Sequence, residues 1–594
     1  MGQQQSRVPP PCDLLAPIHP LKWKIAIDFG TSCSGFAIAL DEFASALNHD
    51  PNTTDLTSVP RLHLTHYIKY NSSWPGARIP YPKTRTALLY DAEGKVVAWG
   101  NEAWERFLGM TTSLQKGHIF TDRFKLLLDA KLDHRDAAMD RLKALGKGPV
   151  EVIADYLRAL VAFLGTYIKH TDPKAELNPF HVCWCLTIPA MWSDAAKQKM
   201  CRALFKAGLI LPLTSDRIIF CSEPMAGLLS AAISTDARIK IQSIDPILIV
   251  DMGGGTVDLT AMRMDGDGFN ELVPGLGASC GSTMLDDRFL AMFRRVVGPK
   301  VYDQVVAQHP KTKLQILRDW EVTKTSFVGE SSFYGSVPIP RAMEKLLADK
   351  GASPSLVEDG EIQITTKILQ DIYAPIVDQI VDLVTKMLDR CKAKGISVSH
   401  VLCIGGFSQS KYLLSALRER LPVNPLKVVA SAHGPAAVLL GAPIFACRPE
   451  LIRSQVARLT YGVRIHAVYQ PSLHGPRHQV AGRLFMGADG ITRTNSAFDV
   501  VIRKGEALSA GQVIEKTYSP IDCTQTLVLF EVFVSHLEDP VFTDTVGCQL
   551  VGKVEIRVTP STHYSSMDPL LMTVRVEHTG CSWSRISART PRLT

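Results

Sequence analysis

The feature that most constrains this chain is a pattern that occurs twice. An apolar run ends in aspartate, and a glycine turn with a hydroxyl residue follows at once, over 24–32 and again over 247–256. In each copy a second apolar run follows the turn, at 35–40 and at 257–262. Two apolar runs joined by a glycine turn predict a β-hairpin. Two hairpins with the same chemistry at their tips indicate two lobes of related fold.

The tips of the two hairpins carry the residue types that a Mg-ATP site needs. Glycine lets backbone N–H groups approach phosphate oxygens, and carboxylates hold a hydrated Mg²⁺. A simple preference of turns for Asp and Gly explains one such hairpin but not two. We therefore predict a phosphate and metal clamp between the tips. The first tip consists of Asp28, Gly30, Thr31 and Ser32, and the second of Asp251, Gly253, Gly254, Gly255, Thr256 and Asp258.

A third glycine turn agrees with a nucleotide site. The apolar run 400–404 ends in Gly405 and Gly406, and a helical pattern follows with Ser408 as the predicted N-cap. A strand, two glycines and a helix N-terminus form a good site for the ribose and the α-phosphate of a nucleotide. This turn alone is weak evidence, but it adds to the two hairpins.

Composition excludes several other classes of protein. The formal charge is only +7 over 594 residues, with no dense Lys/Arg cluster, so nucleic-acid binding is not expected. The uncharged stretch 428–447 contains two prolines and two glycines. We interpret it as a strand, a turn and a buried helix rather than a transmembrane segment. Residues 1–6 fit an N-myristoylation pattern, and acylation of Gly2 would give only reversible membrane contact.

Pattern changes along the chain predict its domains. The α/β pattern has short apolar runs between amphipathic stretches, which is typical of sheets covered by helices. Later segments such as 526–534 and 551–558 alternate like strands and predict a mostly β domain. The predicted units are a disordered lead at 1–22, a nucleotide-binding domain at 23–447 with lobes at about 23–245 and 246–447, a linker at 448–458, a β-rich domain at 459–579 that binds substrates or partners, and a basic tail at 580–594.

These motifs together resemble the 70-kDa heat-shock protein family, and most closely its divergent subfamily 12. The resemblance covers 24–446 clearly and the β-rich part more loosely. Its markers occur in the order of the family at 27–32, 186–190, 222–227, 251–258 and 404–408. The resemblance implies an actin-like two-lobed ATPase domain with duplicated ribonuclease-H-like lobes, followed by a mostly β domain, with ATP or ADP and Mg²⁺ as cofactors.

The resemblance also implies roles for individual residues. Asp28 and Asp251 would bind Mg²⁺ through water, and Glu223 and Asp258 would lie near the metal-bound waters or the attacking water. Lys125 resembles the lysine that neutralises the γ-phosphate, and Phe407 follows the Gly405–Gly406 turn at the adenosine side. Gly281 resembles a nucleotide-site glycine. Glu321 and Lys324 resemble an adenosine-side pair, and a surface i, i+3 helix pair explains them equally well.

Departures from the family pattern lie on the adenine side. Gln409 stands where the family has an arginine, and Phe407 stands where it has a serine. Thr325 replaces a second basic residue, and Pro435 replaces an acidic one. The acidic, leucine-rich connector of the family is also missing from 447–458. We therefore expect intact phosphate and metal contacts, altered adenine contacts and slow ATP turnover.

We expect a cytoplasmic protein, and a nuclear or peripheral membrane location is also compatible with the sequence. Two functional hypotheses follow. The first is an ATP-binding chaperone-like protein that hydrolyses ATP slowly and binds client proteins through its β-rich domain. The second is a non-enzymatic scaffold in which the nucleotide switches a protein-interaction surface. A sugar or metabolite kinase uses the same two-hairpin fold, but the β-rich region and the context of the glycine turns disfavour it.

Overall fold

The computed structural model gives the arrangement of most of the chain. It describes residues 23–47, 62–128, 136–211, 217–235, 245–266, 268–349, 356–421, 426–487, 489–521, 524–558, 570–575 and 587–589. The predictions for the lead at 1–22, for Gly2 and for the basic tail apart from 587–589 fall outside the described residues.

We call the two predicted lobes, at about 23–245 and 246–447, lobe I and lobe II. The first predicted hairpin lies in the middle of a mixed sheet, around which lobe I is built. Strands β1 and β2 pair antiparallel, and β1 also pairs parallel with β8. Ile25, Ala26 and Ile27 are fully buried, because helices cover both faces of the sheet. The strands of this sheet, in spatial order, are β9 (Ile218–Ser222), β8 (Val182–Ile188), β1 (Trp23–Asp28), β2 (Cys33–Ala39) and β3 (Ile68–Tyr70), with the short β4 (Thr84–Arg85) also paired to β2.

The second hairpin has the same surroundings in lobe II. Its strands β10 and β11 pair antiparallel, and β10 pairs parallel with β16. In each sheet the hairpin is therefore followed by two parallel strands on one side and by an antiparallel strand on the other. The strands of this sheet, in spatial order, are β17 (Lys427–Ala430), β16 (His400–Ile404), β10 (Ile247–Met252), β11 (Val257–Asp265), β12 (Gly268–Ala278), β18 (Ile452–Val456) and β22 (Ala507–Ser509).

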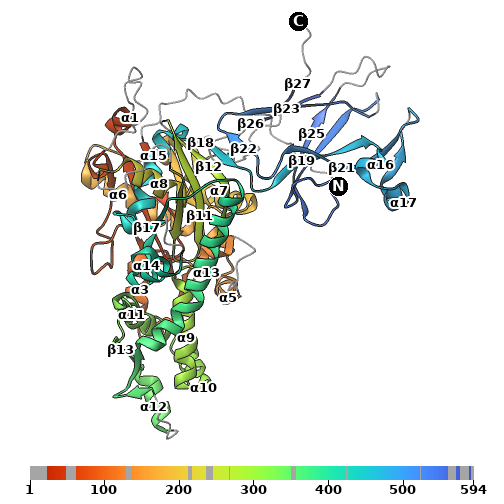
Figure 1. Ribbon diagram of the computed structural model, residues 1–594. Helices are drawn as coiled ribbons and strands as arrows, with labels where there is room; N and C mark the ends of the chain where they lie inside the picture. Colours follow the sequence, from red (N-terminus) through yellow and green to blue (C-terminus); the bar gives the residue numbers. More distant parts are fainter. Residues whose placement is uncertain are drawn as a thin grey trace, which may run out of the picture.

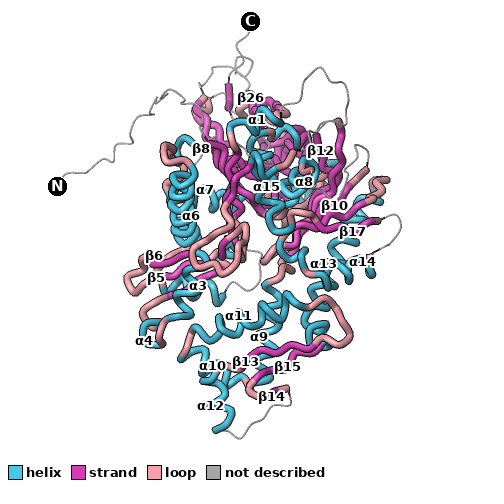
Figure 2. The backbone as a smooth tube through the Cα atoms, turned by 90° about the vertical axis from the view of Figure 1, so that its left-hand side faces the viewer, coloured by secondary structure: helices cyan, strands magenta, loops and turns pink. Residues whose placement is uncertain are grey.

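Two apolar helices lie between the sheets, as Figure 2 shows. Helix α8 (Glu223–Ile233) packs on the hairpin of lobe II, and α15 (Ala437–Cys447) packs on the hairpin of lobe I. They cross so closely that a Cβ at Gly441 would overlap the carbonyl oxygen of Ala226. Helix α15 is apolar on all sides, as expected for a helix buried between two layers. The prediction of a strand and a buried helix over 428–447 is confirmed.

Further helices cover the outer faces of the sheets and extend each lobe away from the β-rich region (Figure 1). Helices α9–α12 and strands β13–β15 form the far end of lobe II, and α3 with β5–β7 forms the matching part of lobe I. The bounds in lobe I are α3 (Gly100–Gly109), α6 (Pro149–Thr171), α7 (Asp194–Ala207), β5 (Ala87–Tyr90), β6 (Val96–Trp99) and β7 (Ile119–Asp122). Those in lobe II are α9 (Thr283–Val297), α10 (Pro299–Gln308), α11 (Lys311–Ser326), α12 (Arg341–Asp349), α13 (Thr366–Ala393), α14 (Lys411–Arg420), β13 (Tyr334–Pro338), β14 (Val357–Glu358) and β15 (Glu361–Thr365).

The C-terminal region is rich in strands, as predicted. The segments predicted as strands at 526–534 and 551–558 correspond to β24 and to most of β25. One sheet consists of β20 (Leu484–Met486), β21 (Thr492–Ile502), β19 (Thr460–Val468), β24 (Leu527–Ser535) and β25 (Cys548–Arg557), and another of β23 (Val513–Tyr518), β26 (Leu570–Arg575) and β27 (Ser587–Arg589). Two short helices, α16 (Pro471–His474) and α17 (Arg477–Val480), lie at its outer end (Figure 1).

The segment 448–458, predicted as a linker, contains strand β18. This strand pairs parallel with β12 of lobe II and antiparallel with β22 of the β-rich region, so one sheet runs through both parts. Among the described residues, no helix is long and apolar enough to cross a membrane.

Candidate functional site

The two hairpin tips meet at a cavity of about 330 Å³ between the lobes. A Cβ added to Gly254 would overlap the hydroxyl of Ser32, and one added to Gly255 would lie 2.6 Å from the Thr31 hydroxyl. Only glycine therefore allows the two turns to approach so closely. The predicted residues that line the cavity are Asp28, Gly30, Thr31, Ser32, Lys125, Glu223, Asp251, Gly253, Gly254, Gly255, Thr256, Glu321, Lys324, Gly405, Gly406 and Phe407.

Two predicted residues lie behind the cavity wall. Asp258 is buried beneath the second tip, where it pairs with Asp251 in the hairpin and accepts a hydrogen bond from the backbone N–H of Met191 at 3.2 Å. Gly281 packs against the glycine turn, and its N–H donates to the carbonyl of Gly255 at 3.2 Å. Both residues support the second tip from below and do not contact the cavity directly.

Asp28 at the first tip has a cationic partner that the sequence did not indicate. The Lys83 ammonium lies 2.5 Å from Asp28 Oδ2, and the Thr187 hydroxyl donates to Asp28 Oδ1 at 2.9 Å. Burial alone would lower the pKa of Lys83, but the adjacent charge of Asp28 outweighs it and the pKa is raised. Lys83 is therefore a charged residue of the site. It precedes β4 in an irregular segment that matches none of the motifs above.

Lys125 forms a second buried ion pair across the cavity. Its ammonium donates to Glu223 Oε1 at 2.7 Å, and the indole ring of Trp192 lies 5.4 Å away. Glu223 is the first residue of α8, where the helix dipole favours a carboxylate. Burial raises the pKa of Glu223, and the neighbouring Lys125 charge limits that rise.

Asp251 and Asp258 are the buried acids of the second tip. Among the residues that the structure describes, no lysine, arginine or histidine forms an ion pair with either carboxylate. Burial and then the charge of Glu223 raise both pKa values, that of Asp258 to about 7. A buried carboxylate that faces a cavity and has no cation fits a hydrated Mg²⁺, which takes one or two acids together with water and phosphate oxygens. The residues of this end therefore fit the metal that the sequence predicts.

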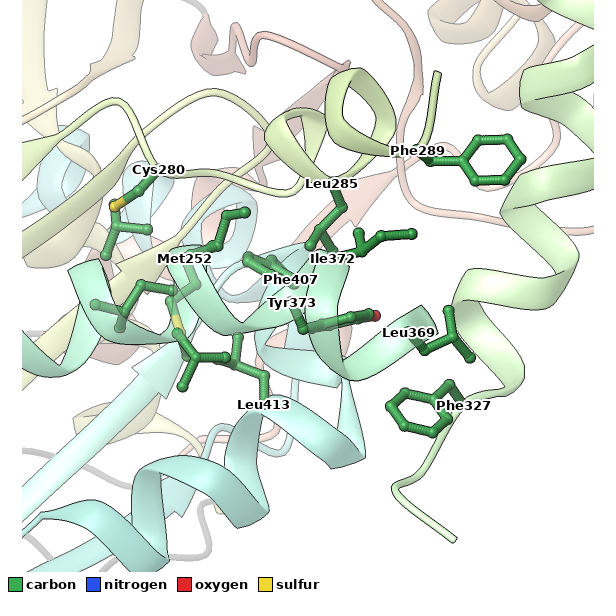
Figure 3. Close-up of a cluster of buried hydrophobic side chains, with 14 of the residues drawn as sticks. Met252, Cys280, Leu285, Phe289, Phe327, Leu369, Ile372, Tyr373, Phe407 and Leu413 are labelled. Atoms are coloured by element: carbon green, nitrogen blue, oxygen red, sulfur yellow. The ribbon is translucent and has the colours of Figure 1, made fainter. Parts of the chain in front are cut away.

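A third lysine of the cavity wall, Lys324, also forms ion pairs. The Lys324 ammonium lies 2.9 Å from Asp286 and 2.6 Å from Glu321, so both acids neutralise it. Lys324 is buried, which excludes a purely surface helix pair for this residue. Tyr373 donates its hydroxyl to the carbonyl of Lys324 at 3.3 Å. Figure 3 shows Phe407 beside Tyr373 in the core of lobe II.

Residues at which the sequence departs from the family pattern also line the cavity. Thr325, Gln409 and Pro435 all contribute to the cavity wall. The prediction that Ser408 caps the following helix is wrong. Helix α14 begins at Lys411, and its N-cap is Ser410, whose hydroxyl accepts a hydrogen bond from the Leu413 N–H. Ser408 lies in a 3₁₀ turn instead and donates its hydroxyl to the Gly405 carbonyl.

The outer parts of the two lobes also contact each other directly. Arg123 of lobe I donates to Asp287 of α9 at 2.9 Å, and the Lys311 ammonium donates to the Met110 carbonyl at 2.8 Å. Arg123 has a positive φ of 57°, which is uncommon for a residue with a side chain. Leu314 of α11 packs in an apolar cluster with residues of α3.

Comparison with known proteins agrees with the resemblance. The family model described as Hsp70 protein matches residues 156–465. Heat shock 70 kDa protein 12B of Homo sapiens is 22% identical over 90% of this chain and 84% of its own length. Heat shock 70 kDa protein 12A of the same organism is 21% identical over 90% of this chain and 85% of its own. Chaperone protein DnaK of Nitrosopumilus maritimus is 24% identical over 47% of this chain and 41% of its own.

Proposed function

The chain belongs to the Hsp70 protein family, and on this premise we propose that it binds Mg-ATP between its two lobes and hydrolyses it slowly as a chaperone-like protein. The observation that carries the proposal is the cavity between the two hairpin tips, which brings glycine turns, hydroxyls, ion-paired lysines and buried carboxylates together. The equivalent strand order around both hairpins supports a duplicated actin-like architecture.

The residues divide the chemistry between them. Bound magnesium would supply positive charge against the phosphate oxygens, held through water by Asp251. Lys125 would place its ammonium against the γ-phosphate, where negative charge develops during transfer to water. Glu223 lines the cavity, and a carboxylate with a raised pKa accepts a proton from attacking water more readily than an ordinary one. The products are ADP and phosphate.

Calorimetric titration of the full chain with ATP and ADP, with and without Mg²⁺, tests this proposal. Asp251→Asn is expected to weaken Mg-ATP binding at least about tenfold, because a charged interaction of roughly 1.5–3 kcal/mol is lost. Asp265→Asn is the matched control, since Asp265 is an exposed acid at the far end of β11, the partner strand of the same hairpin. Equal Mg-ATP affinity in all three proteins would contradict the assignment.

A second function, a non-enzymatic nucleotide switch, has one observation in its favour. Strand β18 joins the sheet of lobe II to β22, so the β-rich region continues that lobe without an unpaired connector over 452–456. A change in lobe closure would therefore move the surface that we propose binds protein clients or partners. Single-turnover hydrolysis separates the two functions. Phosphate release no faster than in Asp251→Asn, despite intact ATP binding, favours the switch.

A further inference from the structure

The charge pattern of the cavity is asymmetric between its two hairpins. Asp28 of the first hairpin forms an ion pair with the Lys83 ammonium, whereas its counterpart Asp251 has no ion-pair partner among the described residues. The other lysines of the cavity form ion pairs with other acids: Lys125 pairs with Glu223, and Lys324 pairs with acids of α9 and α11. Two hairpins with the same motif therefore differ in what balances their aspartate.

The backbone fixes Lys83 in this position. Strand β4 begins at the next residue and pairs with β2, so the Lys83 segment is tied to the first hairpin. Gly35 stands opposite Asp28 in the hairpin register. A Cβ there would lie 2.8 Å from the Pro82 carbonyl oxygen and 3.3 Å from Lys83 Cγ. The missing side chain at Gly35 thus lets the Lys83 stem lie across the strand and reach Asp28.

Lys83 is also placed to contact a ligand. Its side chain lines the cavity and is 12% exposed, while Asp28 is 4% exposed. An ammonium has three donors, and the ion pair with Asp28 leaves capacity for an incoming oxygen. The Gly30–Ser32 turn is part of the same cavity wall, so phosphate oxygens held by that turn would lie beside the ammonium. A tethered cation needs no metal to attract a polyphosphate.

We propose that Lys83 is a built-in cation of the phosphate end, which balances Asp28 and binds the polyphosphate chain directly. The inference rests on the proposed nucleotide function and deepens it. Polyphosphate binding then persists at reduced affinity without a divalent metal, and the metal depends on Asp251 rather than on both aspartates. The ligand class is a nucleoside triphosphate or an inorganic polyphosphate, because Lys83 contacts phosphate and not the base.

The test is titration of the full chain with ATP and with inorganic tripolyphosphate, in excess Mg²⁺ and in excess EDTA. The wild type is expected to bind both ligands measurably in EDTA. Lys83→Met is expected to weaken metal-free binding about 10- to 100-fold, the range for one hydrogen bond to a charged group, and Lys83→Arg to retain most of it. The matched control is Lys147→Met, since Lys147 forms an ion pair with Asp155 at 2.7 Å outside this cavity.

A second variant gives an effect of opposite sign. Asp28→Asn releases the Lys83 ammonium, so metal-free tripolyphosphate affinity should rise, and adding Lys83→Met should remove that gain. If Lys83→Met fails to fold, Asp28→Asn and Lys83→Arg still test the proposal.

The outcomes separate this inference from the proposed function. Wild-type binding of Mg-ATP, combined with equal metal-free affinity in wild type, Lys83→Met and Lys83→Arg, would overturn the role of Lys83 alone. A wild-type protein that does not bind tripolyphosphate at all in EDTA would also overturn the role of Lys83. A wild type that binds neither ligand even with Mg²⁺ would refute the nucleotide function itself.

Discussion

The ion pair between Lys125 and Glu223 predicts a destabilisation whose size depends on pH. Its ammonium and carboxylate lie 2.7 Å apart, with side-chain exposures of 4% and 11%. Lys125→Met removes the cation and leaves the Glu223 carboxylate buried without its partner. Breaking one side of a buried pair costs about 3–5 kcal/mol, because the remaining charge has lost both water and partner. We expect a loss of that size in the free energy of unfolding at pH 8.

Acidification should reduce this loss, and the sign follows from linkage. Burial already raises the pKa of Glu223 in the folded wild type, and removal of Lys125 raises it further. The folded variant then holds a proton more tightly than its unfolded chain, so its stability rises as pH falls through the folded pKa. Each pH unit below that pKa recovers about 1.4 kcal/mol. The gap between wild type and variant should therefore narrow by roughly 1–3 kcal/mol between pH 8 and pH 6.

Urea unfolding at several pH values, without nucleotide and in EDTA, measures both quantities. The double variant Lys125→Met with Glu223→Gln is the control, because it carries no charge at either position. Its stability should exceed that of Lys125→Met at pH 8 and should lack the extra pH dependence. A Lys125→Met deficit that stays constant from pH 8 to pH 6, or a double variant no more stable than the single one, would refute this reasoning.

Three further predictions concern the supports of the site. Gly441→Val should destabilise the protein by at least about 2 kcal/mol in urea unfolding, since even a Cβ overlaps Ala226, whereas Gly109→Ala at an open position should change it by less than about 0.5 kcal/mol. In the wild type, the raised pKa of Asp258 makes the folded state hold its proton, so stability should fall by up to ~4 kcal/mol as the pH rises from about 4 to about 7. Asp258→Asn should remove this fall, and urea unfolding in EDTA across the same range measures it. Gly254→Ala should weaken ATP binding in calorimetry, because its Cβ would overlap the Ser32 hydroxyl and force the tips apart; unchanged affinity would contradict this packing.

The phosphate end could be predicted from the sequence because its chemistry is local. An apolar strand, an aspartate and a glycine turn are consecutive in the chain, and the hairpin that they form places the aspartate at its tip without help from distant residues. The strand and buried helix over 428–447 were predictable for the same reason, since an uncharged stretch with two prolines and two glycines leaves few other structures.

Lys83 and Tyr373 could not be predicted, because their places depend on tertiary structure. Lys83 reaches Asp28 only because β4 pairs with β2 and because the hairpin has a glycine opposite Asp28. Tyr373 belongs to a long amphipathic helix in which many apolar residues face the core, and nothing in its local sequence marks the residue that meets the cavity. The error at Ser408 is of another kind: two serines stood near the expected helix start, and the 3₁₀ turn decided between them.

The connection to the β-rich region limits how the two parts can move. Strand β18 lies between β12 and β22, and Glu271 of β12 accepts a hydrogen bond from the Val456 N–H at 2.8 Å. The Arg458 guanidinium lies 3.5 Å from the same buried carboxylate. Separation of the β-rich region from lobe II would leave this acid without its partners or break strand hydrogen bonds, and either change costs free energy. Rotation of lobe II should therefore move the β-rich region with it more readily than it releases that region.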